Sequence, residues 1–463
     1  MASAAKEVNF SDLGSARRWA LLVMVSAGSS IVYYIPYLRW VFPDQMMEAL
    51  NITNAQIGGL MSAYALTAMI CYLPAGILAD KVRMKTLSWA GYLSTAALIF
   101  LYATLPSSYG VLLLIMIGLG ITTILIWWGT RYKIVRLLFA EDEYPSRIGW
   151  SYAFYGLAGL LVGNVIAQII QHNVDDPAAF LRVLFITIGV IIAVMGVLAL
   201  LFVPFFDNEI DPNAKKLSLD EFIQAIKNPA VIFAALTMFF VYFVYTSITY
   251  TTQWLGVVGV GAAVMTNIAN IRSYGVGIVA GPATGSITKK IGSTSKVIIG
   301  AFILAILVLV AFIILPNNPA LAVVLTVLLG FIVVGTFNVT SGQLSEARVP
   351  ASIFGAATGI LSLIGFLPDT FRDIWFGNLL DGSTNPEGEI DPAVFDKIWI
   401  IVIAAAVLAI VCALAVLRIA KKHDVAEAAA AAAEPVAAVS AEAAAAADGI
   451  EDAADQATDL TGQ

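Results

Sequence analysis

The chain has 463 residues, of which 60% are hydrophobic and 12% are charged, and its mean hydropathy is +0.87. A soluble domain is about 45–50% apolar and about 25% charged, so this composition excludes an ordinary soluble protein and requires a bilayer as solvent. The formal net charge of −7 comes largely from the C-terminal tail and says little about a partner.

Cysteine and histidine are too sparse for a disulfide framework or a metal centre. Cys71 and Cys412 lie inside apolar runs, and His172 and His423 lie near the ends of such runs. We therefore expect no metal, no cofactor, no catalytic residues and no nucleic-acid partner. The first apolar run is too long for the apolar region of a signal peptide and lacks a small-residue cleavage site, so it is expected to span the membrane.

The apolar runs are long and continuous rather than alternating, which favours membrane-spanning helices over a closed barrel. A helical span needs about 20 apolar residues. The sequence predicts an all-α membrane protein with twelve spans, placed at about residues 18–42, 54–79, 86–106, 109–136, 147–171, 180–206, 229–256, 263–288, 296–316, 319–345, 353–380 and 396–420.

The basic residues orient these spans. If the N-terminus lies in the cytoplasm, the cytoplasmic segments hold most of the 25 Lys and Arg residues, as the positive-inside rule requires. An even number of spans then leaves both termini in the cytoplasm. We therefore expect a multi-pass protein of the bacterial inner membrane. Five basic residues fall elsewhere: Arg39, Arg182, Arg272, Arg372 and Lys397.

The polar residues divide the chain into segments. A cytoplasmic N-terminus, 1–17, precedes a six-helix bundle, 18–206. A cytoplasmic linker, 207–228, with turn signals at Asp211-Pro212-Asn213, leads to a second six-helix bundle, 229–420. The tail, 421–463, is rich in Ala and interrupted by acids, so we expect it to be disordered and cytoplasmic.

A short motif occurs once in each half at corresponding places. Gly76 to Lys81 follows the second span and Gly285 to Lys290 follows the eighth, with identical spacing. Glycine lets helices approach closely, and Asp80 at a helix C-terminus needs a cation or a helix N-terminus as partner. We expect these loops to control conformational switching through Gly76, Asp80, Lys81, Arg83, Lys85, Gly285, Lys289, Lys290 and Gly292.

Here the chain resembles the major facilitator superfamily, whose signature loop reads Gly-x-Leu-x-Asp-Arg-x-Gly-Arg-basic. Gly76, Leu78, Asp80, Lys81 and Lys85 match it, whereas Arg83 and Met84 depart from it and Lys289 replaces the acid in the second copy. The resemblance covers about residues 17–420. It implies two pseudo-symmetric six-helix bundles around a solute site near the midplane, and alternating access.

Three branches of that superfamily offer further likenesses. The segments Tyr33-Tyr34 to Tyr64 and Trp128 to Lys133 resemble organic phosphate and organic anion antiporters. Arg272 resembles the arginine that oxalate/formate antiporters use against a carboxylate. Tyr37 and Tyr245 stand where organic phosphate antiporters have arginine.

Charged residues inside spans are costly and mark solute or ion paths. Arg272 can hold an anion by its planar fork, or it can pair with an acid of the eleventh span. Asp369, Arg372 and Asp373 should share one helix face, as proton or ion-pair candidates or as a self-compensating cluster. Arg39 is either a substrate contact or a side chain that reaches the membrane interface.

The remaining charged and polar residues of the spans are interpreted either as anchors to the membrane headgroups or as substrate contacts. Arg131 and Lys133 at the inner end of the fourth span are interpreted as anchors to the headgroups. The candidate substrate-binding residues are Arg272, Tyr34, Tyr37, Arg39, Asn164, Gln168, Tyr245, Tyr250 and Asn338.

With no nucleotide-binding loop in the sequence, transport must be driven by a gradient or by exchange. We expect a monomeric secondary active transporter of a small organic anion, with a carboxylate as the favoured solute, by exchange with a counter-anion or by proton symport. Two alternatives stay open: a transporter of a neutral sugar or nucleoside, and a polytopic membrane receptor or enzyme.

Overall fold

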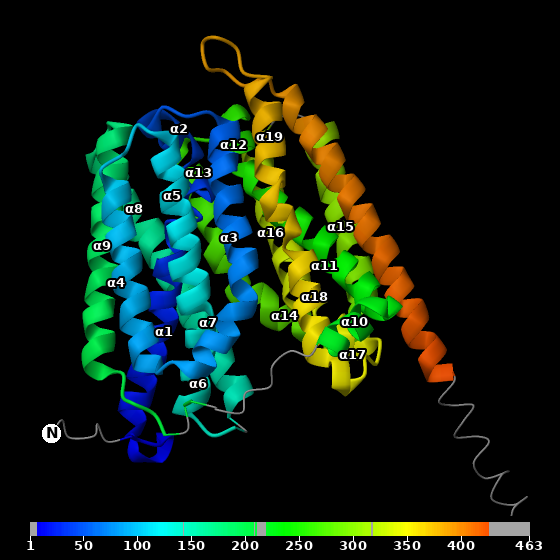
Figure 1. Cartoon of the computed structure of the whole chain (residues 1–463). Coiled ribbons are helices and arrows are strands. Elements are labelled where there is room, and N and C mark those ends of the chain that lie inside the picture. Colours follow the sequence, from blue (N-terminus) through cyan, green and yellow to red (C-terminus); the bar gives the residue numbers. More distant parts are fainter. Residues whose placement is uncertain (1–6, 142, 208, 211–218, 316–317, 426–463) are drawn as a thin grey trace, which may run out of the picture.

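The computed structural model describes residues 7–141, 143–207, 209–210, 219–315 and 318–425 (Figure 1). Within these ranges the chain is helical, with two isolated β-bridges and no strand. The expected tail beyond residue 425, the centre of the expected linker and residues 1–6 lie outside the described residues.

Six membrane-crossing helical segments form the N-terminal half. Two of them contain a π-helical stretch, η3 (Ile121–Trp128) and η4 (Val162–Ile166). A short helix, α2 (Pro43–Leu50), follows the 3-10 turn η2 (Leu38–Trp40). The segments are α1 (Ser15–Tyr34), α3 (Asn54–Lys81), α4 (Met84–Ala103), α5 (Tyr109–Gly120) to α6 (Gly129–Leu138), α7 (Tyr144–Leu161) to α8 (Ala167–Asn173), and α9 (Pro177–Phe202).

The C-terminal half has six corresponding segments. Two short helices, α10 (Leu219–Lys227) and α17 (Gln343–Glu346), lie beside them. The segments are α11 (Pro229–Ser247) to α12 (Thr251–Val257), α13 (Ala262–Asn270) to α14 (Val276–Ile291), α15 (Thr294–Ile314), α16 (Pro319–Thr340), α18 (Phe354–Gly365) to α19 (Arg372–Asp381), and Ala393–Val425.

Ten of these segments are long and apolar enough to cross a membrane by length and composition. The other two are α1, which contains Arg17 and Arg18 close to its start, and the α13–α14 segment, which contains Arg272 and Pro282. Both are helices that run alongside the other ten (Figure 1). Their polar residues lower their hydropathy, although they run the length of the bundle.

Sequence signals fix many helix ends. Asp176, Asn228 and Asn318 each cap a helix whose first residue is proline, the position where the missing N–H costs nothing. Gly292 ends α14 with a φ of 69°, a left-handed conformation that glycine adopts without strain.

One predicted span differs from the structure. The eleventh was predicted as a continuous helix, 353–380, but the helix is interrupted between α18 and α19 by a 3-10 turn, η8 (Leu367–Thr370). Pro368 lies in this turn, where a missing N–H and a fixed φ break helical continuity. The prediction that Asp369, Arg372 and Asp373 share one face of a regular helix is therefore wrong.

Each half has its own buried apolar core. One cluster contains almost only residues of the N-terminal half, while the others contain only residues of the C-terminal half. Large apolar side chains such as Ile70, Leu201 and Leu307 are exposed on the outside, as expected where lipid replaces water as the solvent.

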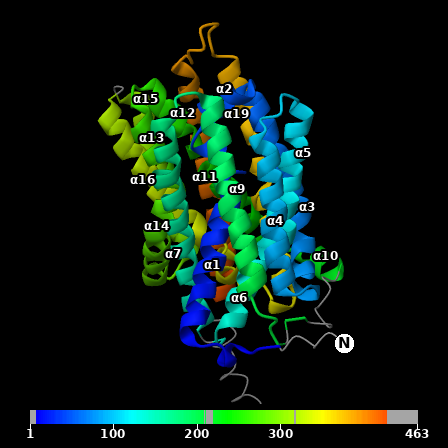
Figure 2. The same ribbon diagram turned by 90° about the vertical axis from the view of Figure 1, so that its left-hand side faces the viewer.

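The two halves meet most closely at one end, which we call the upper end because it is at the top of Figure 1. It carries α2, α12 and the start of α3, whereas α1 begins and the C-terminal helix ends at the opposite, lower end (Figures 1 and 2). A Cβ at Gly58 of α3 would lie 2.3 Å from the Asp373 carbonyl oxygen, and one at Gly377 of α19 would lie 2.5 Å from that of Asn54. Only glycine permits this approach of two backbones.

The motif glycines do not make such contacts. A Cβ added at Gly76 or Gly285 would meet nothing within 4 Å. The expectation that these two glycines let helices pack closely is therefore wrong.

Candidate functional site

A buried ion pair joins the halves at the upper end. Pro36 and Pro43 bracket the turn η2, which presents Arg39 to α19. Arg39 Nη1 lies 2.8 Å from Asp373 Oδ1, and the side chains are 3% and 0% exposed. The sequence-based interpretation of Arg39 as an interfacial side chain is wrong, because its charge is paired inside the protein.

Tyr250 completes this contact. Arg39 Nη2 donates to the Tyr250 hydroxyl oxygen over 2.6 Å, and its guanidinium lies 4.4 Å from the centre of that ring. The Tyr250 hydroxyl donates to Asp373 Oδ1 over 2.9 Å. Asp373 therefore binds the arginine and the phenol at one oxygen, which makes this contact specific in geometry as well as in charge.

The other Asp373 oxygen binds Arg372. Arg372 Nη2 lies 2.5 Å from Asp373 Oδ2 and 3.8 Å from Asp369 Oδ1. Asp369 Oδ2 accepts a hydrogen bond of 2.5 Å from the Tyr242 hydroxyl. The three charged residues of the eleventh span are thus brought together with Arg39, in spite of the helix break.

Arg272 extends from the π-helical segment η6 (Ile271–Gly275) and is 2% exposed. Nη1 donates to Thr251 Oγ1 at 2.7 Å, and Nη2 donates to the Trp40 carbonyl of the other half at 3.1 Å. Within the described ranges no carboxylate lies within 4 Å of it. In this conformation Arg272 does not pair with the acids of the eleventh span.

A second contact across the halves was not predicted. Asp381 at the end of α19 accepts hydrogen bonds from the backbone N–H groups of Asn54 (3.0 Å) and Ala55 (2.8 Å) at the start of α3. Gln253 of α12 also donates to the Asn54 side chain over 2.9 Å. An acid suits a helix N-terminus, but nothing in the sequence links position 381 to position 54.

Arg131 occupies a different kind of site. It lies near the start of α6, just after the π-helical segment η3, and is 4% exposed. Its guanidinium lies over the rings of Tyr132, Tyr152 and Tyr155 at 4.9, 4.5 and 5.2 Å. We call these four residues the arginine cage. Among the described residues, Nε and Nη2 of Arg131 donate to no acceptor.

The interpretation of Arg131 as a headgroup anchor is wrong, because its charge is buried in protein. The sequence does hold a signal that could have indicated this: Tyr152 and Tyr155 lie three residues apart in the next span, so they share one helix face. The cage also reaches the other half, since Tyr155 lies 6.4 Å, ring to ring, from Tyr274.

Most of the remaining predicted substrate residues lie where the halves face each other. Tyr34 stacks on Tyr274 at 5.8 Å, Gln168 donates to Asn267 at 2.5 Å, and Tyr245 lies 6.5 Å, ring to ring, from Trp40. Tyr37 lies 4.4 Å from Trp40, ring to ring.

Two polar residues lack such stacking contacts. Asn164 lies in the π-helical segment η4, and its Oδ1 is buried without a partner among the described residues. The Asn338 side chain lies beside Gly281 of α14, where an added Cβ would be 3.0 Å from Nδ2.

The loop motif of the N-terminal half places its acid near a cation. Asp80 Oδ1 lies 2.8 Å from Lys133 Nζ of α6. Arg83 Nη1 lies 3.0 Å from Glu209 Oε1. Lys81, Lys85, Lys289 and Lys290 lie at the same, lower end of the molecule, where α3 and α14 end (Figure 1).

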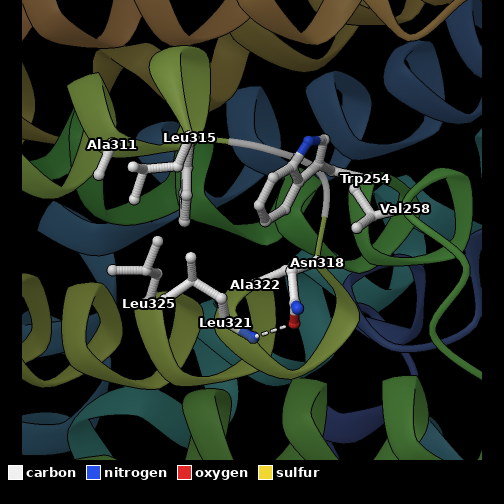
Figure 3. Close-up of a pocket in the computed structure, with 9 residues that line it drawn as sticks. Trp254, Val258, Ala311, Leu315, Asn318, Leu321, Ala322 and Leu325 are labelled. Carbon is white, nitrogen blue, oxygen red and sulfur yellow. Dashed lines mark hydrogen bonds between the residues drawn. The ribbon is translucent and has the colours of Figure 1, made fainter.

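Figure 3 shows a small pocket in the C-terminal half, lined by Trp254, Asn318 and apolar side chains. Its volume of about 10 Å³ has room for one water molecule at most. It contains none of the charged residues described above, so it is a packing feature rather than a solute site.

The comparisons with known proteins agree with this geometry. The model of the Major Facilitator Superfamily matches residues 19–369. The chain belongs to the Major Facilitator Superfamily. This confirms the family resemblance, and it places the chain among transporters rather than enzymes.

Relatives of this superfamily member include two inner membrane proteins of Escherichia coli K12. YqcE is 28% identical over 409 residues, which cover 86% of this chain and 94% of YqcE. YihN is 25% identical over 377 residues, which cover 79% of this chain and 88% of YihN. Together with the apolar helices, they support an inner-membrane location.

Solved structures show the same fold. A bacterial homolog of the human lysosomal transporter Spinster aligns with a TM-score of 0.67 at 15% identity, covering 88% of this chain and 98% of the homolog. The nucleoside transporter NupG aligns with a TM-score of 0.66 at 15% identity, covering 86% and 98%. Similarity at this identity shows the fold alone, and it confirms the predicted all-α architecture of two six-helix bundles.

Proposed function

We propose that this Major Facilitator Superfamily transporter carries a small organic anion, with a carboxylate as the preferred solute. The observation that supports this most directly is the arginine cage. A buried charge is normally paired, yet Arg131 has no carboxylate within 4 Å among the described residues and has free guanidinium donors. A carboxylate would supply both the counter-charge and the acceptors.

Arg272 adds a second buried cation whose described partners are all neutral oxygens. Two such arginines, one in each half, give an anion favourable electrostatics on both sides of the contact between the halves. A neutral sugar or nucleoside could stack on the tyrosines, but it would leave both charges unneutralised.

The proposal includes alternating access by a monomer. Residues 18–206 and 229–420 move as two bodies joined by the linker 207–228, and the solute binds between them. With both termini in the cytoplasm, the upper end is external. The ion pair of Arg39 with Asp373 then closes the outer side, and the lower end is the side from which the solute enters or leaves the cell.

Reporter fusions test this orientation. Fusions at Pro106 and Asn173 should report an external location, and fusions at Lys85 and Lys290 a cytoplasmic one. An inverted result at any of these positions would refute the proposed orientation.

A ligand screen on the purified chain in lipid tests the solute class. Carboxylates, phosphates, sugars and nucleosides are compared by thermal shift and then by counterflow in proteoliposomes. Since a bound ligand stabilises the folded state, we expect melting to rise with one or more carboxylates. Stabilisation and counterflow by a neutral solute alone would overturn the proposal.

Variants locate the anion. Arg131→Gln should weaken carboxylate binding by at least about 30-fold, the effect of removing one member of a buried charge pair, and Arg131→Lys should be intermediate because the fork is lost. The matched control is Arg136→Gln, because Arg136 lies on the same helix but is exposed and pairs with Glu141. Unchanged affinity in Arg131→Gln would exclude the arginine cage as the anion site.

A further inference from the structure

Asp369 is the less satisfied carboxylate of the upper-end cluster, which we define as Arg39, Asp369, Arg372 and Asp373. It is 8% exposed in the turn η8, and Tyr242 donates to its Oδ2 over 2.5 Å. Among the residues that the structure describes, Oδ1 accepts no hydrogen bond, since Arg372 Nη2 at 3.8 Å is too far away. One buried oxygen is therefore free to take up a proton.

The neighbouring acid is satisfied by contrast. Asp373 has Arg39 and Tyr250 on one oxygen and Arg372 on the other. Because Arg372 lies closer to Asp373 than to Asp369, it neutralises the charge of Asp369 only weakly. Arg39 is the one member of this set that comes from the N-terminal half.

The groups facing Asp369 come from several elements. From the same span these are Arg372 and Asp373, and α18 contributes no titratable residue. Among the described residues, the other groups that interact with its charge are phenols, which titrate far above neutral pH in water, so the charge count depends on the carboxylates and arginines. These phenols are Tyr242 and Tyr245 from α11, Tyr64 and Tyr72 from α3, and Tyr37 from the turn before η2.

We propose that Asp369 is the proton-binding site of this transporter, and that Arg39 controls its occupancy by docking on Asp373 when the upper end closes. The inference rests on the proposed transport function and names proton symport as its mode. The proton binds at Oδ1 from water and returns to water, so that no other reactant is needed.

The charges in each conformation determine when Asp369 binds a proton. With Arg39 docked, two arginines balance Asp373 and an ionised Asp369. When the upper end opens, Arg39 leaves with the N-terminal half, and one arginine faces two carboxylates. A second negative charge then favours the protonated form of Asp369. Asp369 thus takes up a proton when the upper end is open and releases it when that end is closed.

In the proposed orientation the proton enters from outside and leaves to the cytoplasm, which drives solute uptake in the same direction. Proton coupling of this kind requires Arg39 to move away from Asp373 when the upper end opens. The contact that closes the upper end therefore also controls the proton site.

The experiment measures the proton itself. The purified full chain in lipid is titrated between acid and neutral pH, and infrared difference spectroscopy records the carbonyl stretch of protonated carboxylic acids. We expect one buried carboxyl band that Asp369→Asn removes and Asp391→Asn, an exposed control at the upper end, retains. A band that persists in correctly folded Asp369→Asn would overturn the proposal.

Arg39→Gln keeps Asp369 intact and tests the switch independently of the folding of Asp369→Asn. Loss of the nearby cation should raise the proton affinity about tenfold or more, seen as a higher midpoint pH of the band. A midpoint that is unchanged or lower would overturn the role of Arg39, and absence of any titrating buried band in the unmodified chain would overturn the site.

These outcomes can be told apart from failure of the proposed function. If a neutral sugar proves to be the solute while the Asp369 band behaves as expected, the anion proposal fails and the proton site stands. If carboxylates bind at Arg131 while the band does not respond to Arg39→Gln, the anion proposal stands and the proton switch fails.

Discussion

Among the described residues, three carboxylates bind N–H groups at the start of a helix that lies more than 50 positions away in the chain, yet they connect different parts of the protein. Asp381 reaches from the C-terminal half to α3 of the other half, with distances of 3.0 and 2.8 Å. Glu209 accepts from the backbone of Met84 at 2.9 Å, and Glu346 from that of Ser295 at 2.8 Å. These last two bonds lie at the lower end and do not join the halves: Glu209 ties the start of the linker to the N-terminal half, and the Glu346 bond lies within the C-terminal half.

The same favourable interaction with a helix N-terminus therefore has two consequences. A bond inside one half survives any movement of the halves, so it contributes to folding stability. A bond across the halves must break when the upper end opens, so it contributes to the balance between conformations. The position of an interaction decides which equilibrium it influences.

Asp373→Asn should have the largest effect on the conformational balance. It removes the counter-charge of both Arg39 and Arg372, and breaking a buried pair costs about 3–5 kcal/mol, which is more than about 100-fold in an equilibrium constant. Pulsed electron paramagnetic resonance between spin labels at Asp175 and Glu387, both exposed at the upper end, should show a longer distance than in the unmodified chain.

A label pair at the lower end serves as the control, because the lower distance should shorten as the upper one lengthens. Unchanged distances at both ends would mean that the ion pair does not hold the upper end closed.

Arg272→Ala should come next. Its Nη2 bond to the Trp40 carbonyl crosses the halves, and hydrogen bonds to charged groups are worth about 1.5–3 kcal/mol. Solute counterflow should fall, and Arg272→Lys should fall less. Because no acid contacts Arg272 in the described structure, adding Asp373→Asn should not restore transport; a double variant that transports normally would show that this base and acid act as a pair.

Asp381→Asn and Glu346→Gln make a matched pair, because the first removes an acid that binds across the halves and the second an acid that binds within one half. Each weakens acceptors at a helix start, an effect of about 1–2 kcal/mol. Asp381→Asn should shift the spin-label distances with little change in melting temperature, whereas Glu346→Gln should lower the melting temperature without moving the labels. The reverse pattern would mean that bonds across the halves stabilise the fold and that bonds within one half set the conformational balance.

Asp80→Asn should have the smallest effect. The Asp80 side chain is 42% exposed and that of its partner Lys133 is 18% exposed. Exposed ion pairs contribute about 0–1 kcal/mol to stability. We expect a transport rate lowered by less than about fivefold, with solute affinity unchanged. A large loss of affinity, measured by the same binding assay, would place Asp80 in the solute site.

The fold followed from the sequence more completely than the contacts did. Apolar runs are local signals, so the helical spans could be predicted. The pairing of Arg39 with Asp373 and of Asp381 with α3 joins residues more than 300 positions apart, and no local pattern encodes such partners. The break at Pro368 had a local signal, but a continuous apolar run concealed it.

The arginine cage and the eleventh span show why the presence of a charge in a span predicts the role of that residue only in part. A charge inside a span drew attention to Arg39, Arg272 and Asp369, which are all buried, but the rule does not say which of them finds a partner. Arg131 was placed near a span end, where an interfacial role is common, although its side chain is buried among tyrosines.

The glycines at Gly58 and Gly377 have a genetic consequence. A methyl group there meets the backbone of the opposite half, but each glycine lies in a helix that folds within its own half. Alanine alleles should therefore yield inactive protein at normal abundance in the membrane, whereas alleles that damage either apolar core should be depleted by proteolysis. Sorting loss-of-function alleles by their abundance would map the surface along which the two halves separate.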